Sequence, residues 1–129
     1  MTGCSVLMIL TACSIIGSPQ KKVTGDYYLT QWEGGPSYYL DRRTKVETQG
    51  DGGKVEGVIQ RIGWNEDLII VNRQGINPPA DDNWVVIDVR KNEVQGGFSD
   101  EQFMNLKREN PSLAQIEIYS AEDAWETLK

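Results

Sequence analysis

The chain has 129 residues, a length suited to one domain, and a formal net charge of -6. With 39% hydrophobic and 25% charged residues, its composition indicates neither a disordered chain nor a multi-span membrane protein. The acidic charge argues against a nucleic-acid partner, because it repels phosphate backbones, and it favours a basic protein partner. The simpler interpretation, which we favour, is that the charge only keeps a small domain soluble.

The cysteine and histidine content limits the kinds of disulfide, metal site and catalytic site that the chain can form. Both cysteines, Cys4 and Cys13, lie in the N-terminal apolar segment, and the chain contains no histidine. The body of the chain therefore has no disulfide framework and no thiolate metal site. The lack of histidine removes the most common general base and the most common transition-metal ligand. We expect a protein that is not an enzyme and that holds no cofactor or metal.

The N-terminal segment has the character of a targeting sequence. Residues 1–20 carry no charged side chain, and apolar residues dominate from 6 to 16. A run this short is poorly suited to spanning ~30 Å of hydrocarbon and is typical of a signal peptide. Residues 1–5 lack the Lys or Arg with which signal peptides usually begin. The alternatives are an uncleaved N-terminal anchor and a buried strand or helix at residues 6–10.

Within this segment, Leu10-Thr11-Ala12-Cys13 resembles the lipobox of bacterial lipoproteins, an aliphatic residue and two small residues followed by cysteine. The resemblance implies a signal peptide at 1–12, lipid attachment at Cys13, a flexible tether at 13–24 and a globular domain at 25–129. It also implies that the bilayer is a partner through acylated Cys13. The protein would then lie on the cell membrane or outer membrane, facing outside the cytoplasm.

Alternating and apolar runs predict an antiparallel arrangement of strands. Residues 26–32 and 37–40, which are rich in aromatic residues, predict a hairpin. One tyrosine of each adjacent pair in this hairpin should be buried and one exposed. Residues 55–62 and 68–71 predict a second hairpin, and 84–89 a further strand. The 68–71 run is apolar at every position, which indicates a central strand covered on both faces.

After these strands, the spacing of the apolar residues changes from that of a strand to that of a helix. Ser99-Asp100-Glu101-Gln102 is a capping-box pattern, which predicts a helix to about Glu109 with Phe103 and Leu106 facing the core. Residues 113–119 alternate and predict another strand. A final helix should follow, with one apolar stripe made of Ala121, Ala124, Trp125 and Leu128.

These elements predict an α+β fold. We expect a small antiparallel β-meander of about five to six strands with one or two short C-terminal helices. The order of GDYYL, SYYLD, GWNEDLIIV, WVVID and GGFSDEQF resembles a family of small bacterial lipoproteins built on a domain of unknown function. The resemblance covers about residues 25–110 and implies no activity.

Four side chains are candidates for an interaction surface. Trp32 ends a strand, Trp64 and Asn65 lie in a turn, and Trp84 shares a strand face with polar residues and should be partly exposed. Aromatic residues at turns can anchor a partner protein or a sugar, or they can cover a small core. The sequence shows no catalytic residue and no set of metal ligands at the required spacing.

We therefore expect a bacterial cell-envelope lipoprotein with a non-enzymatic binding domain. The alternative is an inhibitor or immunity protein that uses its acidic surface and the Trp64 turn against a cationic envelope enzyme or toxin. A third hypothesis is a hydrolase whose two carboxylates come together from distant segments.

Overall fold

The computed structural model describes residues 19–32, 37–43, 55, 57–74 and 83–129, so Cys13 and the rest of the lipobox lie outside the described residues. Two antiparallel sheets and three helices make up this part of the chain. The strands are β1 (Gln20–Thr24), β2 (Tyr27–Gln31), β3 (Tyr38–Arg42), β4 (Ile59–Trp64), β5 (Leu68–Arg73), β6 (Trp84–Asp88), β7 (Glu93–Phe98) and β8 (Ile118–Ser120). The helices are α2 (Asp100–Glu109), α3 (Pro111–Ala114) and α4 (Ala121–Thr127).

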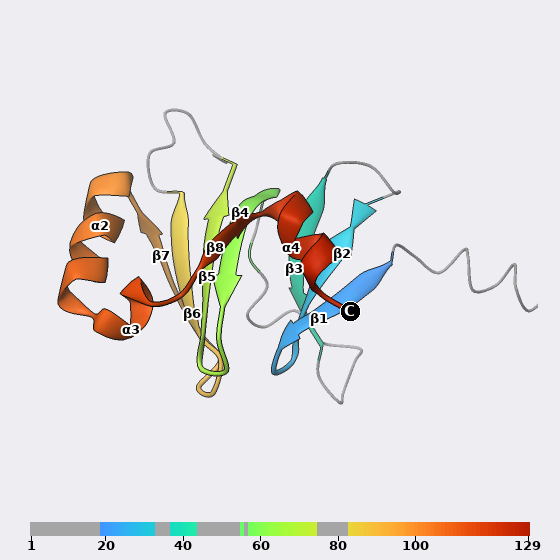
Figure 1. Cartoon of the computed structure of the whole chain (residues 1–129), viewed down its shortest axis with the longest axis horizontal. Coiled ribbons are helices and arrows are strands. Elements are labelled where there is room, and N and C mark those ends of the chain that lie inside the picture. Colours follow the sequence, from blue (N-terminus) through green and yellow to red (C-terminus); the bar gives the residue numbers. More distant parts are fainter. Residues whose placement is uncertain (1–18, 33–36, 44–54, 56, 75–82) are drawn as a thin grey trace, which may run out of the picture.

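The elements are arranged in layers, with a core on each side of the larger sheet. The smaller sheet has the order β1-β2-β3, and the larger has the order β7-β6-β5-β4-β8. One face of the five-stranded sheet packs on the three-stranded sheet and α4 (Figure 1). Helices α2 and α3 cover its opposite face. The α+β class expected from the sequence is confirmed; the described residues form eight strands rather than five to six, and three helices rather than one or two.

Strand β5 lies at the centre of the larger sheet and is buried on both faces. Ile69 and Val71 belong to the core shared by the two sheets, whereas Ile70 belongs to the core under α2 and α3. All three side chains are fully buried. The prediction of a central strand covered on both sides is therefore confirmed.

The three-stranded sheet is buried on one face, and its residues alternate accordingly. Tyr27 and Tyr38 are buried in the shared core, whereas Tyr28 and Tyr39 are half-buried on the other face. This alternation follows the period of a strand, in which neighbouring side chains point to opposite faces. The expectation of one buried and one exposed tyrosine in each pair is confirmed, although the outward one retains partial cover.

Helix α2 begins where its capping box predicts, and α4 has a side-chain cap of its own. Ser99 Oγ accepts a hydrogen bond from the Gln102 amide at 3.1 Å, and Gln102 Oε1 accepts one from the Ser99 amide at 2.9 Å. Ser120 Oγ accepts from the Asp123 amide at 3.1 Å and caps α4 in the same way. None of the helices in the described residues is both long and apolar enough to cross a membrane.

Three segments differ from the sequence-based expectation. Residues 20–24, expected at the end of the tether, form β1, because an edge strand needs only backbone pairing to β2 and one buried apolar residue, Val23. Residues 93–98 form β7, another edge strand without a clear apolar pattern. Pro111 occupies the first turn of α3, where a missing N–H costs nothing, so the predicted strand at 113–119 shrinks to β8.

Candidate functional site

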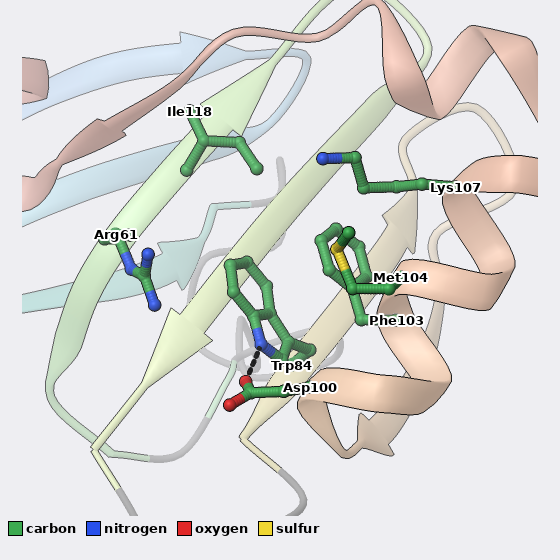
Figure 2. Close-up of a pocket in the computed structure, with 7 residues that line it drawn as sticks. All are labelled: Arg61, Trp84, Asp100, Phe103, Met104, Lys107 and Ile118. Atoms are coloured by element: carbon green, nitrogen blue, oxygen red, sulfur yellow. Dashed lines mark hydrogen bonds between the residues drawn. The ribbon is translucent and has the colours of Figure 1, made fainter.

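A cavity of about 320 Å³ lies between α2 and the five-stranded sheet. Its volume falls at the lower end of the roughly 300–1,000 Å³ typical of small-molecule sites. Arg61 comes from β4, Trp84 from β6 and Ile118 from β8, and α2 supplies the remaining residues. The α2 residues follow one another at helical spacing along a single helix face (Figure 2) and are Asp100, Phe103, Met104 and Lys107.

Two stacked aromatic rings form one wall of the cavity. The centroids of Trp84 and Phe103 lie 4.2 Å apart with an interplanar angle of 6°. The Trp84 Nε1–H donates a hydrogen bond to Asp100 Oδ1 at 2.7 Å, which fixes the orientation of the indole. Trp84 is 6% exposed. The expectation that Trp84 is partly exposed is therefore wrong, because α2 covers its ring.

Two cations flank these rings. The Arg61 guanidinium carbon lies 5.1 Å from the centroid of Trp84, and its Nε and Nη2 each donate to the buried Asn72 Oδ1 at 3.4 Å. Arg61 and Asn72 face each other across β4 and β5. Lys107 Nζ lies 5.7 Å from the centroid of Phe103. Figure 2 shows Arg61 on the β4 side of Trp84, and Lys107 reaching from α2 toward Ile118.

The charge of the cavity differs from that of the whole chain. Arg61 and Lys107 contribute two positive charges and Asp100 one negative charge. Within the described part of the chain, neither cation forms an ion pair; the ion pair found there joins Arg90 to Asp67. The cavity therefore has a local excess of positive charge beside an aromatic wall, in a protein whose net charge is -6.

Trp32 lies elsewhere, on the face of the three-stranded sheet that points away from the core. Its ring makes an edge contact with Tyr39 at a centroid distance of 6.5 Å. Together with Thr30 and Asp41, the two rings line a separate hollow of about 270 Å³. Trp32 is 53% exposed, more than any other large hydrophobic residue in the described part of the chain.

Trp64 and Asn65 occupy a third place, at the turn between β4 and β5. The Trp64 ring is partly buried, 5.6 Å from that of Tyr119, against the shared core. Asn65 Oδ1 accepts hydrogen bonds from the amides of Asp67 and Leu68, both at 2.8 Å, and so closes the turn. The charge of neighbouring Glu117 raises the pKa of Tyr119.

The four candidate residues therefore do not form one surface. The sequence identified Trp84 but not its partners Arg61, Asp100 and Lys107. The sequence does show that Asp100 and Lys107 lie on one face of the predicted helix, since they are two helical turns apart. The register that brings Arg61 beside them was not visible. Within the described residues, no group of three or more His, Cys, Asp or Glu side chains could hold a metal ion.

Comparison with known proteins gives no further guide to the ligand of the cavity. No family model matches the chain, and neither a curated protein nor a solved structure matches it. The resemblance to a lipoprotein family therefore remains a prediction from the sequence.

Proposed function

We propose that this protein is a lipid-anchored lipoprotein of the bacterial envelope whose domain binds an anionic ligand that carries a flat or apolar group. The observation that carries the binding role is that Arg61 and Lys107, from two different elements, flank a cavity walled by Trp84 and Phe103. The lipobox that ends at Cys13 supports the anchor.

The groups around the cavity suit such a ligand in two ways. A guanidinium group offers paired N–H donors that match a carboxylate, sulfonate or phosphate, and an ammonium group adds a second point charge. Met104 and Ile118 offer apolar surface for a flat or aliphatic part, against a wall made by the largely buried rings of Trp84 and Phe103. A ligand with both features would gain from both kinds of contact at once.

We infer a role in binding rather than catalysis from what Asp100 does in this site. Its carboxylate accepts the indole N–H of Trp84 at 2.7 Å, so it holds the aromatic wall in place. The wall is itself packed in the core under α2, where Phe103 is 2% exposed. A rigid, oriented wall of this kind favours recognition, because little ordering is needed when a ligand binds.

The anchor is tested by the mass of the protein extracted from membranes after expression of the full chain in a bacterial host. We expect a mature chain that begins at Cys13 and carries added acyl mass, and we expect Cys13→Ala to abolish that mass. An unmodified chain that retains Met1 in the soluble fraction would show that the anchor is wrong.

The binding site is tested with a probe of the proposed class, 1-anilinonaphthalene-8-sulfonate, and with its neutral analogue N-phenyl-1-naphthylamine. The full chain should bind the sulfonate more tightly, and the difference should shrink with added salt. Arg61→Gln and Lys107→Gln should each weaken sulfonate binding about tenfold, or about 1.4 kcal/mol. Lys91→Gln, on an exposed turn residue, is the matched control and should change nothing. Equal sulfonate affinities in all four proteins would contradict the site.

The inhibitor or immunity role has weaker support. Trp64 packs on Tyr119, and the Asn65 side chain is used within its own turn. The turn therefore presents Glu66 and Asp67 rather than a protruding aromatic anchor, and Asp67 pairs with Arg90. A tight, salt-sensitive complex with a basic envelope hydrolase would revive this role.

A further inference from the structure

Among the described residues, no helix or second sheet covers one face of the three-stranded sheet. Cross-strand pairing and side-chain contacts place on this face Gln20, Lys22, Tyr28, Thr30, Trp32, Tyr39, Asp41 and Arg43, which we call the outer face. Its opposite face is buried in the shared core. The outer face lies on the far side of the molecule from α2 and α3 (Figure 1).

The outer face combines exposed aromatic rings with cations. The indole of Trp32 is 53% exposed and touches half-buried Tyr39. Lys22 is exposed, and the exposed Arg43 guanidinium lies 4.8 Å from the centroid of Tyr28. Trp and Tyr are enriched where bilayers meet water, because their rings are apolar and their N–H and O–H groups need polar partners.

The acidic residue on this face already has a partner. Asp41 Oδ2 accepts a hydrogen bond from Thr30 Oγ1 at 3.0 Å, and Thr30 Oγ1 in turn accepts one from Gln20 Nε2 at 3.0 Å. The carboxylate is therefore tied to the sheet, whereas the Lys22 and Arg43 side chains form no ion pair in the described part of the chain. The cations are available to anionic headgroups.

The chain enters the fold beside Trp32. The Gln31 amide donates to the Pro19 carbonyl at 3.0 Å, and Gln20 pairs with Thr30. Gln20 follows Cys13 by seven residues. Even fully extended, that connection reaches at most about 25 Å. A lipid on Cys13 would therefore hold this end of the three-stranded sheet close to the bilayer surface.

We propose that the outer face rests on the membrane, with Trp32 and Tyr39 at the headgroup level and Lys22 and Arg43 toward anionic lipids. This inference depends on the proposed lipid anchor at Cys13. It deepens that proposal by giving the domain an orientation, because the cavity beside α2 would then open on the side away from the bilayer. A ligand would reach it from the aqueous phase.

The test uses the full chain, purified in its acylated form and inserted into vesicles of phosphatidylethanolamine and phosphatidylglycerol. Lipids with a nitroxide in the headgroup region should quench part of the tryptophan fluorescence. Trp32→Phe should lose most of that quenching. Trp64→Phe, which replaces another partly exposed indole at a distant turn, is the matched control and should keep it.

Each outcome of this experiment separates the two proposals. Acyl mass on Cys13 with equal quenching in wild type and Trp32→Phe, or with none, would overturn the membrane contact and leave the anchor intact. A second copy of the chain on the outer face would give a different result: no quenching by the lipids, but protection of Trp32 from iodide that rises with protein concentration. That result would also overturn the membrane contact. A chain without acyl mass would overturn the anchor, and the inference that depends on it.

Discussion

Among the described residues, other elements cover both faces of the five-stranded sheet but only one face of the three-stranded sheet. In β5 of the larger sheet, consecutive residues Ile69 and Ile70 are both fully buried, each in a different core. In β2 of the smaller sheet, consecutive residues Tyr28 and Leu29 are half-buried and fully buried. Strand β5 therefore has apolar side chains on both of its faces, whereas β2 has them on one face and carries polar and aromatic side chains on the other.

That face is stable because its polar groups hydrogen-bond to one another. Gln20, Thr30 and Asp41 form a chain of hydrogen bonds across the three strands. The Arg43 guanidinium lies over the Tyr28 ring, with its carbon 4.8 Å from the ring centroid. In the described part of the chain the two outer layers therefore differ: helices α2 and α3 cover the five-stranded sheet and leave a cavity, whereas the outer face of the three-stranded sheet has no such cover.

The largest expected effect comes from alanine substitutions that compare the two strands. Ile69→Ala and Ile70→Ala should each lower the free energy of unfolding by about 2–5 kcal/mol, since each empties part of a core. Leu29→Ala should cost a similar amount, but Tyr28→Ala only about 1 kcal/mol or less. Chemical denaturation measures all four. A small effect of Ile70→Ala would contradict a second core under α2.

A smaller effect is expected where the two sheets meet at a turn. Gly25 has a φ of 60°, and a Cβ there would lie 2.5 Å from Val89 Cγ1. Gly25→Ala combines an unfavourable backbone conformation with a clash, so we expect a loss of about 1–3 kcal/mol in the free energy of unfolding. Val89 is itself buried in the shared core, so Val89→Ala has its own cost, but Gly25→Ala should cost less in the Val89→Ala background than in wild type. An equal cost of Gly25→Ala in both backgrounds would show that the clash is not the cause.

The smallest effect at neutral pH is expected for Tyr27→Phe. Tyr27 is fully buried, and its hydroxyl has no hydrogen-bond partner within the described part of the chain. Removing it should leave the free energy of unfolding unchanged or raise it by up to about 1 kcal/mol.

The same variant should differ from wild type in alkali. Burial raises the pKa of Tyr27, so the unfolded chain loses this proton at a lower pH than the folded chain. Wild-type stability should fall as the pH rises above the ordinary tyrosine value of about 10, and Tyr27→Phe should fall less steeply. Denaturation curves at neutral and alkaline pH test this. Identical slopes would show that Tyr27 does not titrate differently on folding.

The features that could be predicted from the sequence are those encoded by a few neighbouring residues. The capping box from Ser99 to Gln102 predicts the start of α2, because both hydrogen bonds join residues three apart. The apolar run in β5 predicts burial on both faces. In each case the signal and the structure lie within one segment.

The features that could not be predicted depend on pairing between distant segments. β1 and β7 are edge strands held by backbone hydrogen bonds, which leave no apolar pattern in the sequence. The cavity needs Arg61 from β4 and Trp84 from β6 to share a face with Lys107 from α2. No short sequence pattern encodes that register. Of the residues that line the cavity, only Trp84 was therefore named as a candidate from the sequence, and the prediction that it is partly exposed was wrong.

The contact between β1 and α4 has a consequence for when the domain can fold. Lys21 Nζ donates to the Trp125 carbonyl at 2.9 Å and lies 4.6 Å from the centroid of its ring, although the two residues are 104 positions apart. Trp125 also fills the shared core, and β8 pairs with β4. Contacts between residues so far apart in the chain form slowly, because a long loop must close before they are made. The shared core can therefore be completed only after α4 has been synthesised. If the protein is exported as we propose, this delay would help the chain to pass unfolded through a translocation channel.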